Sequence, residues 1–390
     1  MPIDKQQTLK LLEELVAIES VNPTLVPGAR GEQRAAEHVR EFLRAKGIAA
    51  ELEEVAPGRP NVVAILGRAR HESPKPALMI VAHIDTVGAG DMREPFTPRV
   101  CDGRMYGRGA LDIKSGVAAM CAAAVEIVRE GARLARPVML AAVVDEECNS
   151  IGTEALLRRG HSADAAIVLE PTDLKLVIAH KGYAWFEIVT HGRAAHGSLP
   201  AEGRDAIRMM GRVLAALDEL ETRLVSRAAH PRLGSASLHA SLIEGGQELS
   251  SYPAECRLQL ERRMLPGETE QGAEAELREM LAGLEKPLKN VAEFHATLRG
   301  GLGARPAYEI REDAPLVKRA SAAIAPVCGA CELSGMAAWT DTALLAAAGI
   351  PGVVFGPSGR GLHGAEEYVE LDSVVKCAEA LRELILEFCG

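Results

Sequence analysis

Aromatic residues are scarce in this sequence, where Phe, Trp and Tyr together make up 3% of 390 residues. Few aromatic rings leave few platforms on which the bases of single-stranded nucleic acid could stack. The formal net charge of -10 also repels a phosphate backbone. Nucleic acid is therefore not expected as a partner.

Long hydrophobic runs are missing as well, because no uninterrupted apolar stretch approaches the roughly 20 residues that a membrane-spanning helix needs. At the amino terminus, Leu11, Leu12, Leu15 and Ile18 recur at helical spacing between charged residues, which predicts an amphipathic helix and not a signal peptide. The eight cysteines are scattered along a long chain, which favours reduced thiols over a disulfide framework. We therefore expect a cytoplasmic protein without a membrane partner.

The balance of residue types is that of a folded globular protein, with 47% hydrophobic and 25% charged residues. A chain of 390 residues is too long for one comfortable hydrophobic core. Two domains are therefore the default expectation, and one large domain that carries an insert is a variant of it.

Four apolar segments rich in β-branched residues predict buried strands. They are Ala77–Ala82, Val138–Val144, Ala166–Leu169 and Gly352–Phe355. Helix-like stretches rich in alanine, such as Ser115–Glu130 and Thr342–Ala348, alternate with them. This order predicts an α/β fold with a doubly wound, mostly parallel sheet.

The pattern changes between residues 181 and 295. The segments YAWFEIVTHG and CRLQLERRM alternate like half-exposed strands, and Asp205–Leu224 is helical. The first pattern resumes later in the chain. We therefore expect a discontinuous larger domain, residues 1–180 and 296–390, with a smaller α+β domain, residues 181–295, inserted into it.

Residues that can bind metals or move protons follow each predicted buried strand. They are His83, the pair Glu146 and Glu147, Glu170, and His363, which lies in a glycine-rich loop. Ligands bind in open α/β sheets at the crevice outside the carboxyl ends of the strands. These distant segments can therefore converge on one site.

Three successive carboxylates, from Asp145 to Glu147, follow an apolar strand. Like charges at a buried strand end raise one another's pKa unless a cation neutralises them, which favours a metal site and leaves one carboxylate to carry a proton. His83 and Asp85 are two residues apart, so the imidazole can bind a metal while the carboxylate holds it. Each feature has a simpler alternative, such as a solvated acidic turn or a hydrogen-bonded pair in a loop.

Asp112 lies in the glycine-rich segment GRGALDIKSG just before a predicted helix. It could be a helix N-cap, whereas phosphate binding is set aside because the segment lacks the Gly-Lys-Ser/Thr ending of a P-loop. As a set, two histidines and three carboxylates are the ligands that Zn²⁺ and neighbouring metals take. Two metals that share a bridging carboxylate could each receive one histidine and one further carboxylate, with water between them.

The chain resembles a family of two-metal hydrolases that includes acetylornithine deacetylase, succinyl-diaminopimelate desuccinylase, aminoacylase and carboxypeptidase G. The resemblance covers nearly the whole chain. It rests, in order, on the motifs AHIDTV, GRGALDIKSG, DEE, LEPT, AAHGSLPAEG and GIPGVVFGP with its downstream histidine. It implies that the inserted domain is a ferredoxin-like dimerisation or lid domain and that the protein is a homodimer.

The resemblance also implies a role for each site residue. Two divalent ions, usually zinc with cobalt or manganese as alternatives, are bound by His83, Asp112 as the bridge, Glu147, Glu170 and His363. Asp85 orients His83, and Glu146 is the general base that activates the bridging water. His196 of the partner subunit stabilises the oxyanion, and Arg263 binds the substrate carboxylate.

The reaction implied is hydrolysis of an amide by a metal-bridging hydroxide. In the family, the position of Glu170 is commonly Glu in deacylases and Asp in carboxypeptidases, which favours removal of an N-acetyl, N-succinyl or similar group from an amino acid. A carboxypeptidase or dipeptidase acting on short peptides is the alternative. A relative that only binds metal or a small molecule is a third reading, and retention of Glu146 argues against it.

Overall fold

The computed structural model describes residues 2–67, 75–284 and 294–390, and the chain divides into two compact units. The larger unit comprises Met1–Ile178, Ile310–Ser334 and Thr340–Gly390, and the smaller comprises Ala179–Glu309 and Gly335–Trp339. The smaller unit continues beyond residue 295, where the sequence pattern placed its end. The reason is that β12 (Ala296–Arg299) and β13 (Ala304–Arg305) both pair with β9 (Gly182–His191).

The larger unit is built on a mixed β-sheet. In spatial order its strands are β1 (Ala50–Ala56), β2 (Arg59–Leu66), β6 (Val138–Val143), β3 (Leu78–His83), β7 (Ala165–Leu169), β16 (Gly352–Phe355) and β8 (Leu176–His180). Two short strands, β14 (Tyr308–Glu309) and β15 (Leu333–Met336), pair with β8. The pairs β6–β3, β3–β7 and β7–β16 are parallel, whereas β1–β2, β2–β6 and β8–β16 are antiparallel. The predicted α/β class is confirmed.

The four parallel strands are the four that the sequence predicted, shifted by one residue at most. Every residue of β3, β6, β7 and β16 is buried. Strands covered on both faces need apolar side chains at every position, and for this reason the segments are continuously hydrophobic and do not alternate.

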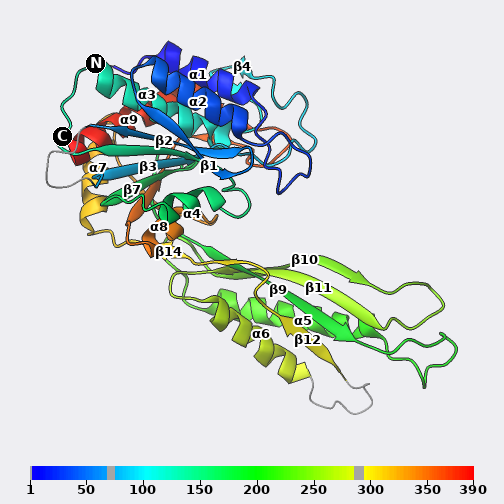
Figure 1. Ribbon diagram of the computed structural model, residues 1–390. Helices are drawn as coiled ribbons and strands as arrows, with labels where there is room; N and C mark the ends of the chain where they lie inside the picture. The colour runs from blue at the N-terminus through cyan, green and yellow to red at the C-terminus, as the bar shows by residue number, and fades with distance from the viewer. Residues whose placement is uncertain (1, 68–74, 285–293) are drawn as a thin grey trace. The chain divides into compact units, whose positions relative to one another are not determined.

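Helices cover both faces of this sheet. They are α1 (Lys5–Ala17), α2 (Gln33–Ala45), α3 (Ser115–Arg129), α4 (Ile151–Arg158), α7 (Pro315–Cys328), α8 (Thr342–Ala347) and α9 (Leu371–Cys389). Figure 1 shows α1, α3 and α9 on one face and α4 and α8 on the other. In α1 the predicted Leu11, Leu12 and Leu15 are buried, and the Asp4 side chain caps the helix by accepting from the Gln7 amide at 3.0 Å.

A second, small sheet brings together two segments that are far apart in the sequence. Its strands, in order, are β17 (Gly359–Arg360), β18 (Tyr368–Glu370), β5 (Arg104–Tyr106) and β4 (Arg99–Cys101). Pairing of Tyr368 with Tyr106 places the chain just after His363 beside the chain just before Asp112. The fold thereby delivers two predicted metal ligands to one region.

The smaller unit has the chain order β9, α5 (Ala206–Ser226), β10 (Ser237–Gly245), β11 (Glu255–Met264), α6 (Glu270–Leu284), β12. Its strands lie in the order β10-β11-β9-β12 and all these pairs are antiparallel. This is the predicted ferredoxin-like arrangement. Buried residues of β9 and β11, such as Phe186 and Leu258, share one core with Met210 and Val213 of α5.

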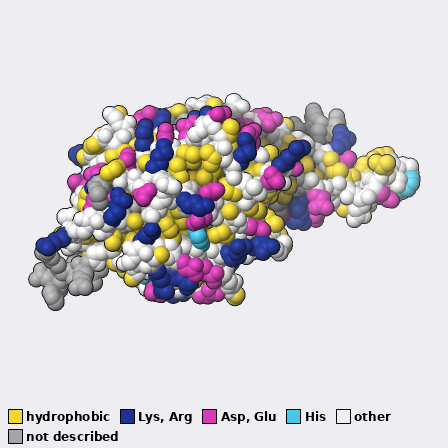
Figure 2. Space-filling view, turned by 90° about the horizontal axis from the view of Figure 1, so that it is seen from above, with side chains coloured by type: hydrophobic (Ala, Val, Ile, Leu, Met, Phe, Trp, Pro, Cys, Tyr) yellow, Lys and Arg dark blue, Asp and Glu magenta, His cyan; other side chains and the backbone are white. Residues whose placement is uncertain are grey.

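Acidic and basic side chains are interspersed over the face shown in Figure 2. Within residues 2–67, 75–284 and 294–390, no helix is both long and apolar enough to cross a membrane. All eight cysteines are free thiols, as expected, although Cys328 and Cys331 stand at Cys-x-x-Cys spacing.

Candidate metal centre

The carboxyl ends of three neighbouring parallel strands supply most of the predicted ligands. His83 is the last residue of β3, Glu147 lies in the turn after β6, and Glu170 directly follows β7. Since β6, β3 and β7 are adjacent and parallel, these side chains emerge at the same edge of the sheet.

Asp112 lies between the two predicted histidine ligands. Its Oδ1 is 3.2 Å from Nε2 of His83, and its Oδ2 is 3.2 Å from Nε2 of His363. Glu170 Oε1 lies 3.9 Å from His83 Nε2, and Glu147 Oε2 lies 3.2 Å from His363 Nε2. Each oxygen of Asp112 therefore faces a different histidine, and each histidine has one further carboxylate beside it.

Two overlapping groups of donor atoms have the spacing of a metal site. Donor atoms of His83, Asp112 and Glu147 lie within 4.8 Å of one another, and so do those of His83, Glu146 and Glu170. Glu147 Oε1 is buried and has no hydrogen-bond partner among the residues that the structure describes. A buried carboxylate oxygen without a donor is costly, so this oxygen fits a metal ligand.

The charges at this site are unbalanced without a cation. Burial, reinforced by the neighbouring charge of Glu170, raises the pKa of Glu146 well above its usual value. Burial likewise raises the pKa of Glu170 and of Glu147, although a nearby histidine opposes each shift. Bound divalent cations would remove this strain by letting all the carboxylates ionise.

The histidines respond to the same excess of negative charge. Burial alone would lower the pKa of His83, but the facing carboxylates of Asp112 and Asp85 raise it well above its usual value. Hydrogen bonds with Asp112 and Glu147 raise the pKa of His363 to about 10. The donor set therefore attracts cations of any kind, protons included.

Asp112 is not a helix cap. It lies inside a short, kinked helical turn, η1 (Ala110–Lys114), and its backbone angles there are not helical. Gly109 enters this turn with a φ of 80°, and a Cβ at Gly109 would stand 2.7 Å from the Thr86 side chain. A glycine is therefore needed for the turn to pass so close to the chain after β3.

His363 stands on an exposed loop and has a positive φ of 58°. Gly361 precedes it with a φ of 90°, and a Cβ there would collide with the backbone oxygen of Glu366 at 1.8 Å. Left-handed backbone at a non-glycine residue persists only where surrounding contacts hold it. The loop is thus shaped to turn the His363 ring toward Asp112 and Glu147.

Asp85 has a broader role than the predicted one of orienting His83. The ring hydrogen bond of His83 goes from Nδ1 to the backbone oxygen of Asp85 at 3.0 Å, which leaves Nε2 free to bind a metal. The Asp85 carboxylate accepts the backbone N–H groups of Glu146 and Glu147, at 3.1 and 3.2 Å. Asp85 therefore holds the His83 ring through its main chain and the turn that carries Glu146 and Glu147 through its side chain.

A buried polar network behind Asp85 was not predicted from the sequence. Asn22 donates to Asp85 at 2.8 Å and to Asp145 at 3.0 Å. Arg59 donates to Asp145 at 2.8 Å, to Asn22 at 3.1 Å and to the fully buried Glu32. These side chains come from separate parts of the chain, and no spacing pattern connects them.

Asp341 is another buried carboxylate that the sequence reasoning missed. Burial raises its pKa to about 6, and Thr153 donates a hydrogen bond to it at 2.5 Å. Its charge acts on Glu146 and Glu170, whose pKa values it raises further. The only local signal was an Asp at the start of α8, a common N-cap position, yet its side chain caps nothing there.

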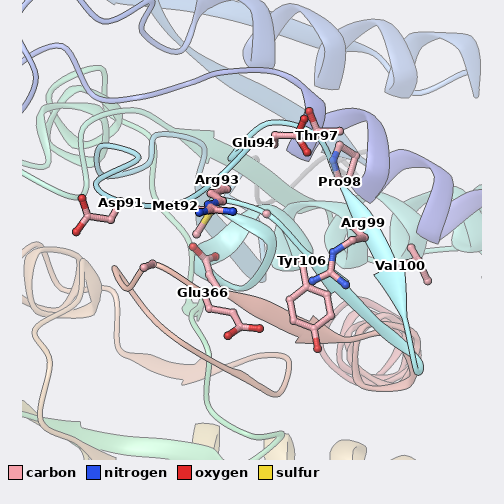
Figure 3. Close-up of a pocket in the computed structure, with 13 residues that line it drawn as sticks. Asp91, Met92, Arg93, Glu94, Thr97, Pro98, Arg99, Val100, Tyr106 and Glu366 are labelled. Carbon is pink, nitrogen blue, oxygen red and sulfur yellow. The ribbon is translucent and has the colours of Figure 1, made fainter.

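A cavity of about 670 Å³ lies next to the loops of the centre (Figure 3). Its lining includes Arg99, Tyr106, Glu366 and Glu367. The Arg99 guanidinium lies 4.3 Å from the centre of the Tyr106 ring. The cavity is lined by neighbouring loops and not by the rings of His83 and His363, so it is separate from the metal centre.

His196 and Arg263 belong to the smaller unit. His196 is exposed, and its Nδ1 accepts the backbone N–H of Ser198 at 3.2 Å. Arg263 donates to Glu261 at 2.6 Å and lies 5.5 Å from the centre of the Tyr183 ring. The five predicted metal ligands, Asp85 and Glu146 all belong to the larger unit.

Comparison with known proteins decides the family. Residues 79–387 match the family described as Peptidase family M20/M25/M40, which is most of the chain. The chain belongs to this family. Members of the M20/M25/M40 family act on amides, so the chain is a metal-dependent amide hydrolase, and the predicted resemblance is confirmed.

Two relatives match the chain over nearly its full length, and their names describe enzymes that remove an acyl group. The chain is 26% identical to N-formyl-4-amino-5-aminomethyl-2-methylpyrimidine deformylase of Bacillus subtilis (strain 168), over 99% of the chain and 95% of that protein. It is 27% identical to acetylornithine deacetylase of Vibrio atlanticus (strain LGP32), over 98% of both proteins.

Solved structures share the fold. A tripeptidase from Staphylococcus aureus superposes with a TM-score of 0.79 at 22% identity, over 99% of this chain and 98% of that one. A protein from Bacillus subtilis described as a dinuclear metal binding peptidase of the M20 family superposes with a TM-score of 0.71 at 18% identity, over 98% and 97%. Both likenesses show that the chain shares the fold of these proteins.

Proposed function

We propose that the protein removes a small N-acyl group, such as acetyl, succinyl or formyl, from an amino acid or a similar amine. The observation that carries the proposal is Asp112, whose two oxygens each face a different histidine. The names of the deformylase and deacetylase relatives support the acyl group as the part released.

The ligands divide into two sets around Asp112. We propose that one divalent ion is held by His83, Asp112 and Glu170 and the other by His363, Asp112 and Glu147. Nitrogen and carboxylate donors of this kind suit zinc, with cobalt and manganese as alternatives. Ions of this type, when bound, would act as Lewis acids and would lower the pKa of the attacking water.

Glu146 is the proposed general base: its carboxylate lies near donor atoms of His83 and Glu170, and the proposed ligand sets do not use it. In the metal-free chain, burial and the charge of Glu170 raise its pKa, and bound cations would let it ionise, as a proton acceptor must. It takes a proton from the attacking water and returns one to the departing amine. Asp85, through its bonds to the Glu146 and Glu147 amides, keeps this carboxylate in place.

His196 is the proposed donor to the oxygen that becomes negatively charged during attack. Because Nδ1 accepts the Ser198 N–H, the ring proton of the neutral imidazole sits on Nε2, which is the arrangement that a donor needs. Following the family resemblance, we propose that His196 acts across a homodimer. Arg263 is the proposed partner of a substrate carboxylate. Its guanidinium, which already donates to Glu261, would then bind both carboxylates.

A hydrolysis panel tests the substrate class. Purified protein loaded with Zn²⁺ should release amine from N-acetyl, N-succinyl or N-formyl compounds faster than from dipeptides and tripeptides. Faster release from the peptides would favour the peptidase alternative, and no release from any amide in the presence of bound metal would leave only the binding role.

Replacing the general base tests the mechanism. Glu146→Gln should lower kcat by about 10²- to 10⁴-fold, the usual contribution of a general base, while metal content stays at the wild-type level. Glu154→Gln is a matched control, because Glu154 pairs with Arg158 on the surface of α4. A Glu146→Gln enzyme with wild-type turnover would rule out this role for Glu146.

A further inference from the structure

A buried ion pair connects the loops around the metal centre without supplying a ligand to it. Arg108 is 2% exposed and Glu367 is 1% exposed. Arg108 Nη1 donates to Glu367 Oε2 at 2.7 Å. Burying two charges costs free energy that their attraction often fails to recover, so a pair of this kind calls for a reason beyond stability.

Glu367 binds the turn that carries Asp112. Its Oε1 accepts the backbone N–H groups of Leu111 at 2.8 Å and Asp112 at 3.2 Å, and its Oε2 accepts that of Gly109 at 3.1 Å. The first N–H groups of a helical turn have no partner within the turn, and a carboxylate satisfies them strongly. The side chain of Glu367 thus takes the place of a cap for η1.

Arg108 binds the two other loops. Its Nε donates to the backbone oxygen of Gly88 at 3.1 Å, in the chain that follows His83. Its Nη2 donates to the backbone oxygen of Gly364 at 3.0 Å, directly after His363. The planar guanidinium offers several donors in fixed directions, so one side chain can hold both loops at once.

Together, Arg108 and Glu367 contact the loops of three of the five proposed ligands: His83, Asp112 and His363. In sequence, the contacts lie closest to His363. Gly364 is the next residue after His363, and Glu367 follows His363 by four residues. That loop is exposed and holds its ring through a left-handed residue. Apart from the pair, the short β5–β18 pairing and a hydrogen bond from the Gly107 N–H to the Glu367 backbone oxygen at 3.2 Å link the two segments.

We propose that the ion pair of Arg108 and Glu367, here called the loop clamp, is a positioning device that sets the distance between Asp112 and His363 for one of two metal ions. This inference rests on the metal centre of the proposed function. The clamp acts on metal affinity through the backbone and takes no part in proton transfer.

Metal titration of the metal-free protein tests the clamp. Glu367→Gln keeps the side-chain size, but its NH₂ group would face the donors of Arg108 and Gly109. Residues that orient ligands typically contribute 10- to 100-fold to metal affinity. Competition with a chromogenic chelator should therefore show Zn²⁺ bound about 10- to 100-fold more weakly, with the loss falling mainly on one of two ions.

Glu130→Gln is the matched control, since Glu130 also pairs with an arginine, Arg382, at 2.7 Å. It should match wild type in both zinc affinities, whatever it does to thermal unfolding. Arg99→Lys is a second control in the cavity beside the clamp (Figure 3). If Glu367→Gln folds poorly, Arg108→Lys is the alternative variant. It keeps the positive charge but loses the planar guanidinium with its several donors, and it should weaken one zinc site by a smaller factor.

Wild-type zinc affinities in Glu367→Gln or in a folded Arg108→Lys would overturn the clamp. An equal loss of affinity in Glu130→Gln would do so too, because it would indicate a general effect of stability. These zinc affinities test the clamp independently of the proposed function. A wild-type protein that binds two zinc ions but hydrolyses no amide would refute that function and leave the clamp intact.

Discussion

The two histidines of the metal centre differ in how the fold holds them. The His83 side chain is 1% exposed, ends a central parallel strand, and is fixed through Nδ1 by the backbone of Asp85. The His363 side chain is 52% exposed and stands on a loop. Its Nε2 contacts the carboxylates of Asp112 and Glu147, each at 3.2 Å.

This difference indicates that one half of the centre is pre-organised and the other is held by its loops. Behind His83, the buried residues Asp85, Asn22 and Arg59 form a continuous hydrogen-bonded network. On the side of His363, the loop clamp holds the backbone and leaves the ring open to solvent. We therefore expect the His83 side to control the stability of the fold and the His363 side to control access and exchange of one ion.

The largest expected effect is on the stability of the metal-free protein. His83→Ala should lower the free energy of unfolding by about 3 kcal/mol or more, because it leaves the buried carboxylates around it without their cation. His363→Ala should cost about 1 kcal/mol or less, because the ring is 52% exposed and solvent screens its ion pairs. Urea unfolding of both variants in the presence of a chelator measures the difference. Equal costs would show that the two halves are equally rigid.

The next effect is a pH dependence that only the metal-free protein should show. Asp341 has its pKa raised to about 6 by burial, so between pH 4 and 6 the folded chain keeps a proton that the unfolded chain has lost. The folded state then binds more protons, and its stability must fall as pH rises through this range, by about 3 kcal/mol for a shift of this size. The raised pKa values of Glu146 and Glu170 act in the same direction.

Asp341→Asn provides the comparison for this pH dependence. Urea unfolding at pH 4, 5, 6 and 7 should give a shallower fall in the metal-free variant than in metal-free wild type. Zn²⁺ should flatten the wild-type curve, because bound cations let the carboxylates ionise. Metal-free stability that rises from pH 4 to 6 would contradict the charge imbalance described for the site.

A smaller effect is expected from the network behind His83. Asn22→Ala removes one donor to Asp85 and one to Asp145 without touching a ligand. Zinc affinity should fall by about 10-fold, the lower end of the range for residues that support metal ligands. Asn149→Ala is a suitable reference, because the backbone N–H of Asn149 that donates to Asp145 is kept and its side-chain amide donates to Cys148. An unchanged affinity in Asn22→Ala would mean that Asp85 is held well enough by its other contacts.

The sequence predicted the centre of the sheet better than its edges. The strands β3, β6, β7 and β16 are buried on both faces, so their continuous hydrophobicity was visible locally. The flanking strands β2 and β8 pair antiparallel with them and are almost as buried, but the sequence analysis did not single them out. The sequence pattern ended the smaller unit at residue 295, before β12 and β13. These strands belong to it because they pair with β9, which lies more than 100 residues earlier in the chain.

For the site, the sequence indicated residues that stand at strand ends and missed those that hold them. Arg108 and Glu367 are separated by more than 250 residues and each looks like an ordinary surface charge. Arg59, Glu32 and Asn22 are similar cases. Their roles arise from burial and from hydrogen bonds between remote segments, which no local spacing encodes.

The most direct test of the account is the number of metal ions bound per chain, measured by elemental analysis after zinc loading and gel filtration. Wild-type protein should hold about two ions, and Asp112→Ala should hold fewer than one, because each oxygen of Asp112 serves a different histidine. One ion or none in the wild type, or two ions retained in Asp112→Ala, would contradict a centre bridged by Asp112.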